Sequence, residues 1–207
     1  MPVAQRDAGA RASDDHRAGW VITVIVQLTV TAWLALEAAL IIRDRVRGKG
    51  GFARDRGTLW LNVIIMTVAL GAAGTLTASL KNSAWQFGPT GLAGPIVMWT
   101  GLAVRIWAIV VLGQSFRTTV EVDAGQRVVD AGPYRWVRHP SYTGILLLMA
   151  GLSLVYGNWP ALAVLLVLPT GVLIYRIFVE EAVLTEVLGR AYADYAARTK
   201  RLVPGVW

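Results

Sequence analysis

The sequence predicts an all-α integral membrane protein with about five transmembrane helices, the last two forming a hairpin, and a C-terminal amphipathic helix on the cytoplasmic side. Of its 207 residues, 55% are hydrophobic and only 16% are charged, whereas about a quarter are charged in a typical soluble domain. Its long uncharged runs can cross the roughly 30 Å hydrocarbon core as helices. These runs are too long and too uniformly apolar for the alternating strands of a membrane barrel.

The N-terminal half predicts a tail and a three-helix membrane region. Residues 1–18 are polar, without an apolar period, and predict a mobile tail. The next apolar run is too long for a cleaved signal peptide and ends in a charged block instead of a cleavage site. The membrane region covers residues 19–112, with predicted spans at 19–42, 58–80 and 92–112.

Two charged residues lie within these three spans, where isolated charges are expensive. Glu37 is near the end of the first span, and this position favours a boundary or packing role over chemistry. Arg105 lies about two turns from the end of the third span. Its side chain is expected either to reach the interface or to pair with a carboxylate inside the bundle.

Residues 113–207 predict a second region with a polar segment, a helical hairpin and a final helix. Glycines interrupt the polar segment 113–140. The fourth span, 141–156, is short, and the tight connection Gly157-Asn158 joins it to a fifth helix that Pro160 can open. The final stretch, to about Arg198, carries its apolar residues on one side.

The distribution of Lys and Arg predicts the orientation of the chain. With five spans, fifteen of these residues fall on the side of the C-terminus and four on the side of the N-terminus. The positive-inside rule then predicts an N-terminus outside and a C-terminus in the cytoplasm. The net charge of +7 is accounted for by this topology and by contact with anionic lipids, and it does not indicate nucleic-acid binding. No obligate protein partner is evident.

Residue usage excludes several kinds of site. There is no Cys, so disulfides, thiolate metal sites and Cys nucleophiles are absent. The chain has two His, and neither has a second ligand nearby, so no metal site is predicted.

The densest polar motif is residues 132–144, which contain two Arg, one His, two Tyr and two Pro. Pro140 fits the first turn of a helix, where a missing N–H costs nothing. Arg138, His139 and Tyr142 should therefore cluster where a membrane helix meets water. The same residue types also serve as plain interfacial anchors, which is the alternative.

A second motif is Arg176, Glu180 and Glu181, spaced to lie on one side of a helix. The simplest interpretation is a surface ion pair between residues four apart. However, two adjacent acids beside the hydrocarbon zone need partners, and Arg135, Arg138 and His139 are the nearest cations. A pocket with Arg138, His139, Tyr142 and Glu180 could hold a zwitterion, with Arg or helix N–H groups on its carboxylate and Glu on its ammonium or on a ribose diol.

Three motifs together resemble the isoprenylcysteine carboxyl methyltransferase family, which is related to membrane phospholipid methyltransferases. They are Gly-Pro-Tyr-x3-Arg-His-Pro-x-Tyr-x-Gly at 132–144, Arg-x3-Glu-Glu at 176–181 and Leu-Gly-x2-Tyr-x2-Tyr at 188–195. The resemblance covers about residues 110–207 and implies that 113–207 form a methyltransferase core. It implies S-adenosyl-L-methionine as cofactor, with S-adenosyl-L-homocysteine as product, and a lipophilic or lipidated substrate arriving from the bilayer.

The resemblance also implies roles for individual residues. Arg176 matches the residue placed toward the accepting group of the substrate, and Glu180 matches an acid that contacts the cofactor, so these two are the catalytic candidates. Many family members have His where Gln126 stands. The candidate cofactor-binding residues are Glu121, Gln126, Arg127, Val128, Val129, Tyr134, Arg138, His139, Pro140, Ser141, Tyr142, Glu180 and Glu181.

The sequence leaves the acceptor open. A sulfonium methyl is already activated, so positioning does most of the work. A carboxylate acceptor needs no base, and Arg176 would orient it, whereas a phenol or amine needs a base such as Glu180 or Glu181. A phenolic or isoprenoid lipid and a phospholipid amine are therefore alternatives. Alternatives of another class are a membrane scaffold, or a small transporter, for which only Gln27, Glu37 and Arg105 supply polar groups within the spans.

Overall fold

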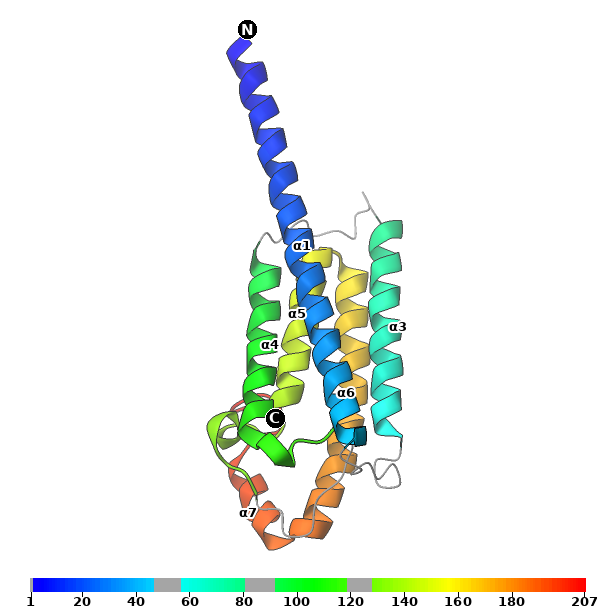
Figure 1. Cartoon of the computed structure of the whole chain (residues 1–207), viewed down its shortest axis with the longest axis vertical. Helices are drawn as coiled ribbons and strands as arrows, with labels where there is room; N and C mark the ends of the chain where they lie inside the picture. The colour runs from blue at the N-terminus through cyan, green and yellow to red at the C-terminus, as the bar shows by residue number, and fades with distance from the viewer. Residues whose placement is uncertain (1, 47–56, 81–91, 119–127) are drawn as a thin grey trace.

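The computed structural model is a bundle of helices that run along one axis (Figure 1). It describes residues 2–46, 57–80, 92–118 and 128–207. Five long helices pass through the bundle in alternating directions, and a short helix lies across one end. The helices are α1 (Pro2–Val46), α3 (Thr58–Ser79), α4 (Ala93–Leu112), α5 (Pro140–Tyr156), α6 (Trp159–Leu188) and α7 (Arg190–Arg198), with 3-10 turns at Gly113–Ser115 and Gly132–Arg135.

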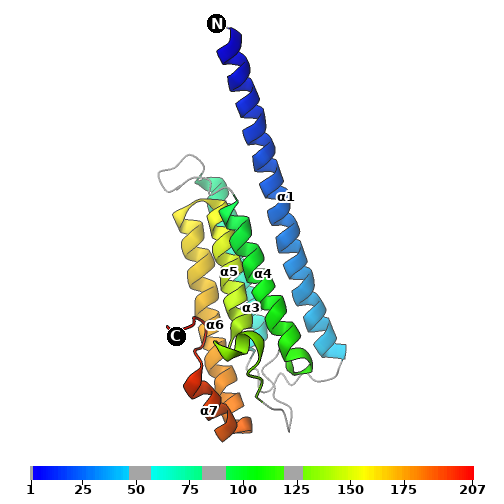
Figure 2. The same ribbon diagram turned by 90° about the vertical axis from the view of Figure 1, so that its left-hand side faces the viewer.

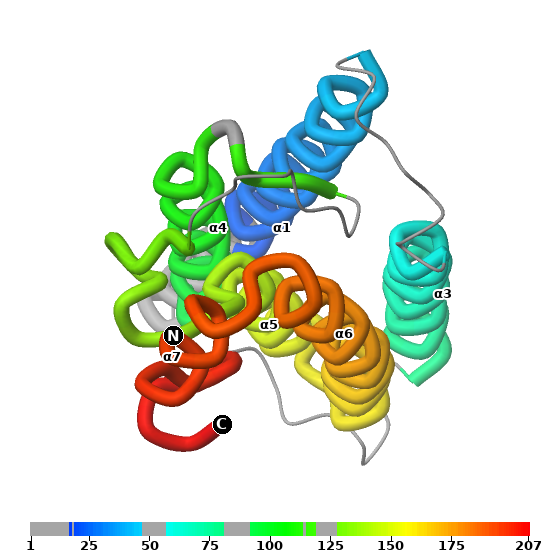
Figure 3. Tube along the Cα trace, turned by 90° about the horizontal axis from the view of Figure 1, so that it is seen from below, coloured from blue at the N-terminus to red at the C-terminus, as the bar shows by residue number. Residues whose placement is uncertain are grey.

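This architecture confirms the predicted all-α membrane class. Four helical segments are long and apolar enough to cross a bilayer: Gly19–Val46, Thr58–Ser79, Ala93–Leu112 and Trp159–Leu188. The predicted fourth span corresponds to α5, an apolar helix of 17 residues that is shorter than the four candidate spans. That length is slightly short of the roughly 20 residues that a full crossing needs. α5 lies among the other helices (Figure 3).

Residues 1–18, predicted as a mobile tail, are part of a helix from Pro2 onward. α1 is helical from Pro2, and its N-terminal part projects beyond the bundle (Figure 2). This segment contains several Ala and Arg, which are strong helix formers. Because the apolar part of the same helix already provides a nucleus, extending the helix outward avoids the cost of starting a new one.

Interlocked glycines bring α4 and α5 into close contact. A Cβ added at Gly101 would lie 2.5 Å from the carbonyl oxygen of Gly144, and one added at Gly151 would lie 2.6 Å from that of Gly94. The two backbones therefore touch at two points seven residues apart on each helix. Small residues let the backbones of two membrane helices approach closely, and the resulting van der Waals contact stabilises the helix pair.

The predicted hairpin of the last two long helices is confirmed. Gly157 ends α5 with a φ of 66°, which favours glycine, and Asn158 caps α6 by accepting a hydrogen bond from the Ala161 N–H at 2.9 Å. The fully buried Asn158 also donates to Thr77 Oγ1 at 2.8 Å, which ties the hairpin to α3. The predicted C-terminal helix is present as α7, after a break at Gly189.

The extended backbone at Lys200 and Arg201 holds the motif 132–144 at the end of the bundle by hydrogen bonds. The Arg138 N–H donates to the Lys200 carbonyl at 2.7 Å, and the His139 N–H donates to the Arg201 carbonyl at 3.0 Å. The start of α5, the end of α6 and α7 consequently meet at one end of the bundle, together with the end of α1 and the start of α3 (Figures 1 and 3).

Candidate active site

A cavity of about 340 Å³ opens at this end of the bundle. We call its two regions the polar arm and the apolar arm. The polar arm is lined by Val128, Val129, Tyr134, Arg138, His139, Tyr142, Glu180, Leu184, Leu188, Tyr192 and Tyr195. The apolar arm lies between α1 and α3 and is lined by Trp33, Leu34, Ala38, Ile41, Leu59, Asn62, Val63, Met66, Thr67 and Leu70.

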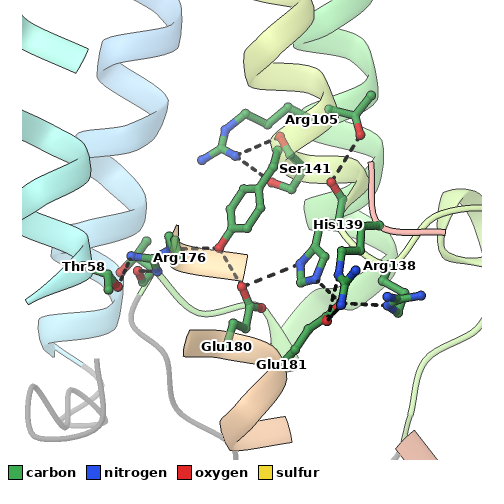
Figure 4. A network of polar contacts seen from close by, with 12 residues as sticks. Thr58, Arg105, Arg138, His139, Ser141, Arg176, Glu180 and Glu181 are labelled. Atoms are coloured by element: carbon green, nitrogen blue, oxygen red, sulfur yellow. Dashed lines mark hydrogen bonds and ion pairs between the residues drawn. The ribbon is translucent and has the colours of Figure 1, made fainter. Parts of the chain in front are cut away.

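Arg176 lines the cavity and contacts both arms, through Thr58 next to Leu59 of the apolar arm and through Tyr142 of the polar arm. Figure 4 shows it beside Thr58. Its side chain is 5% exposed although it carries a permanent charge. The guanidinium donates to Thr58 Oγ1 at 3.0 Å, to Tyr142 Oη at 2.8 Å and to the Thr118 carbonyl. These contacts come from α3, α5 and the segment after α4, so they fix the guanidinium from three sides.

The hydroxyl of Tyr142 connects the two catalytic candidates. It accepts from Arg176 Nε and donates to Glu180 Oε2 at 2.7 Å. Arg176 and Glu180 are therefore joined through this tyrosine, and the surface ion pair that their spacing also allowed is not what these residues form. The Glu180 side chain is 31% exposed and faces the cavity, so one carboxylate remains accessible in the polar arm.

Glu181 lies in a denser ion network on the other side of His139 (Figure 4). Its carboxylate accepts from Arg138 Nε at 2.8 Å and from Arg201 Nε at 3.0 Å, and it lies 3.3 Å from His139 Nε2. Arg138 also donates to the Ala196 and Thr199 carbonyls, which binds the end of α7 to this network. Glu181 is not among the residues that line the cavity, and its carboxylate is enclosed by Arg138, His139 and Arg201.

His139 occupies the position between the two acids. Its ring is buried and stacks on Tyr142, with the ring planes 2° apart and the centroids 5.4 Å apart. Its Nδ1 lies 3.7 Å from Glu180 and its Nε2 faces Glu181. Because the imidazole contacts Glu181 through Nε2 and lies parallel to the Tyr142 ring, it restricts the orientation of that ring and thus of the Tyr142 hydroxyl.

Arg105 was predicted either to reach the membrane interface or to pair with a carboxylate inside the bundle. The structure shows the second arrangement, with Glu37 as the partner. The Arg105 Nε and Nη2 donate to the two carboxylate oxygens of Glu37 at 2.6 and 2.7 Å. Its Nη1 donates to Ser141 Oγ at 2.6 Å (Figure 4). The Trp33 N–H adds a third hydrogen bond to Glu37, at 2.8 Å. This network joins α1, α4 and the first turn of α5 beside the cavity.

A second contact attaches α1 to the segment after α4. Asp44 accepts from both the N–H and the hydroxyl of Thr118, at 2.7 and 2.8 Å, while Arg43 donates to the Phe116 carbonyl at 2.9 Å. Since the Thr118 carbonyl in turn accepts from Arg176, the end of α1 helps to position the central arginine.

Three tyrosines form the far wall of the polar arm. Burial raises the pKa of Tyr195 to about 12, so its hydroxyl is neutral and donates to the Tyr134 carbonyl at 2.9 Å. Burial also raises the pKa values of Tyr134 and Tyr192, which stay protonated as well. Tyr192 is 5% exposed, and its Oη has no hydrogen-bond partner within the described part of the chain.

Most of the predicted site residues do gather in one place. Those that line the cavity are Val128, Val129, Tyr134, Arg138, His139, Ser141, Tyr142, Arg176 and Glu180. Pro140 is fully buried and begins α5 without lining the cavity. Glu121, Gln126 and Arg127 lie outside the described residues.

The sequence prediction missed the partners contributed by the first helices. Thr58 and Asn62 carried no signal, because single polar residues in an apolar run are common. Glu37 and Arg105 were recognised in the sequence as charged residues within spans, but their pairing with each other could not be predicted from it.

The fold and site define a multi-pass α-helical membrane protein with a polar binding region joined to an apolar one. Residues 95–186 match the model of the isoprenylcysteine carboxyl methyltransferase (ICMT) family. The solved structure of the eukaryotic intramembrane Ras methyltransferase ICMT is similar, with a TM-score of 0.56 and 25% identity, over 70% of this chain and 52% of that one. This region of the chain is therefore similar to the isoprenylcysteine carboxyl methyltransferase family in both sequence and fold.

Curated relatives match about half of the chain. Protein-S-isoprenylcysteine O-methyltransferase B of Arabidopsis thaliana is 32% identical over 113 residues, which cover 51% of this chain and 55% of that protein. The enzyme of Schizosaccharomyces pombe is 30% identical over 107 residues, 45% of each chain. The protein YpbQ of Bacillus subtilis is 30% identical over 100 residues, 44% of this chain and 60% of that protein. The chain thus spans about half the length of these relatives.

Proposed function

We propose that this chain is an integral membrane methyltransferase that uses S-adenosylmethionine to methylate a lipophilic acceptor, as the names of its relatives indicate for them. The observation that carries the proposal is a continuous cavity that joins the polar arm, with Glu180 in its wall, to the apolar arm, with Arg176 between them. Such an arrangement brings a polar molecule and a lipid together at one point, which is what transfer between them requires.

The polar arm fits the proposed cofactor. Glu180 is an accessible acid for an ammonium or a ribose diol, and Tyr192 has a buried hydroxyl with no partner among the described residues. Leu184, Leu188 and Val129 offer apolar walls for a flat base. When bound, the cofactor supplies a methyl group already activated by a sulfonium. The chain's own residues then have to hold the acceptor in line and keep water away.

The charge of the cavity favours an anionic acceptor. Four arginines are among the described residues that line it (Arg105, Arg117, Arg138 and Arg176). Glu37 pairs with Arg105 and Glu181 pairs with Arg138, which leaves Glu180 as the lining acid opposite Arg117 and Arg176. A cleft with an excess of one sign concentrates ligands of the other. Arg176, held by Tyr142, Thr58 and the Thr118 carbonyl, would orient a carboxylate, which needs no general base because it is already ionised. For a phenol or an amine, Glu180 would be the base.

Two of the three polar residues that a transporter would need within its spans are already paired with each other. Glu37 and Arg105 pair with each other, and this pairing leaves neither charge available along a translocation path. We further propose the orientation predicted from the Lys and Arg count, with the N-terminus outside and the catalytic end of the bundle in the cytoplasm.

Binding and turnover in purified protein test the proposal. Calorimetry in detergent should detect S-adenosylmethionine and S-adenosylhomocysteine, and a methyl-transfer screen should compare prenylcysteine, phenolic and amine-headed lipids. Glu180→Gln should weaken cofactor binding, while Glu186→Gln, an exposed acid on the same helix, should not. Arg176→Ala should reduce turnover and leave cofactor affinity close to wild type. Absence of cofactor binding in folded wild-type protein would exclude the function.

A further inference from the structure

Two buried polar side-chain atoms have no hydrogen-bond partner within the residues that the structure describes, and both line the cavity. One is Tyr192 Oη in the polar arm, and the other is Asn62 Oδ1 in the apolar arm. A buried polar atom without a partner is costly, so nearly all such atoms in folded proteins are satisfied by a protein group, a ligand or water. Their positions in opposite arms point to two different ligands.

Asn62 lies one helical turn further into the bundle than Thr58, which accepts from Arg176. Four residues of helix separate them by about 6 Å. Further along this face of α3 come Val63, Met66 and Leu70, together with Thr67, whose hydroxyl already donates to the Val63 carbonyl. Asn62 is therefore the last polar group with spare hydrogen-bonding capacity before the apolar wall.

The carboxamide is not accounted for by helix packing. Polar residues in membrane helices commonly join neighbouring helices by hydrogen bonds. Asn158 does so with Thr77, but Asn62 Oδ1 accepts from no group in the described part of the chain. Its oxygen is an acceptor, so the partner that it lacks is an N–H or O–H donor.

We infer that Asn62 is a specificity-determining residue that accepts a hydrogen bond from an N–H or O–H group of the acceptor. This inference rests on the proposed methyltransferase function. The separation of about 6 Å from the Arg176 contact places this donor a few bonds from the methylated group. The acceptor would thus carry, in order, an anionic head at Arg176, a donor at Asn62 and an apolar chain between α1 and α3. A lipid-modified acid with an amide N–H or a hydroxyl near its carboxylate has this order.

The test compares paired acceptors that differ only in whether this donor is free or blocked by a methyl group. The wild type should show a KM about tenfold lower for the free-donor lipid, the effect of one hydrogen bond. Asn62→Leu should bring the ratio of the two KM values close to one. Its affinity for S-adenosylhomocysteine and its melting temperature should not fall, because the substitution removes a buried polar atom that has no protein partner.

Tyr192→Phe is the matched control, because it removes the other unpartnered polar atom, in the polar arm. It should weaken S-adenosylhomocysteine binding several-fold and preserve the discrimination between the paired lipids. The inference is overturned if Asn62→Leu keeps the wild-type ratio, if it loses both acceptors equally, or if the wild type does not distinguish them. Failure of the wild type to bind S-adenosylhomocysteine would instead refute the underlying function.

Discussion

The ion pair between Glu37 and Arg105 should be the strongest single determinant of stability among the polar contacts of the bundle. Both groups are largely removed from water, with side-chain exposures of 24% and 5%, and two hydrogen bonds of 2.6 and 2.7 Å join them. Removing one partner of a buried pair leaves a charge uncompensated and costs about 3–5 kcal/mol. We therefore expect Arg105→Met and Glu37→Met each to destabilise by about 3 kcal/mol, and the double variant to lose much less than their sum.

Thermal unfolding of the protein in one detergent measures this coupling. For a chain of this length, about 3 kcal/mol corresponds to a loss of about 6–12 °C in melting temperature. Arg198 and Asp130 provide the control, because they also form an ion pair, but both side chains are 60% exposed. Arg198→Met should change stability by less than about 1 kcal/mol. Additive losses in the Glu37 and Arg105 double variant would show that the two residues stabilise the fold independently and would refute the reasoning.

Three further outcomes are expected. Gly144→Ala should destabilise by about 1–3 kcal/mol, because its Cβ would lie 2.6 Å from the Gly101 carbonyl, whereas Gly171→Ala, with open space around it, should not; equal melting curves would exclude close packing of α4 and α5. Tyr142→Phe should lower kcat/KM at least about tenfold by removing the hydroxyl that joins Arg176 to Glu180, and an unchanged value would leave that bridge without a catalytic role. A reporter fused to the C-terminus should be active only on the cytoplasmic side, and activity on the outer side would reverse the proposed orientation.

Local sequence patterns were sufficient for the elements of the fold. Hydrophobic runs and their interruptions predicted the long helices to within a few residues at most ends, because a helix in lipid has to satisfy its backbone internally whatever its neighbours are. Gly157-Asn158 predicted the hairpin, since a left-handed position followed by a capping side chain specifies a tight connection locally. The exception was residues 1–18, where a polar composition suggested irregular structure and the adjoining helix extended through it.

Residues within a motif could likewise be predicted to lie together. The run from Arg138 to Tyr142 is contiguous, and the acids on α6 are adjacent, so each group was placed without tertiary information. The contacts of each side chain could not be predicted in this way. Glu180 and Glu181 are neighbours in sequence, yet one faces the cavity and the other is enclosed by Arg138, Arg201 and His139.

The sequence by itself determined the class of protein, the helices and the residues of the two site motifs. Only the tertiary structure decided that Glu37 pairs with Arg105, that Thr58 supports Arg176 across 118 positions of sequence, and that Asn62 faces the cavity without a partner of its own among the described residues. The physical reason is that a helix forms from interactions within a few residues, whereas the partner of a buried polar group depends on which helix faces it and at what rotation. That choice is made by the packing of all the helices together.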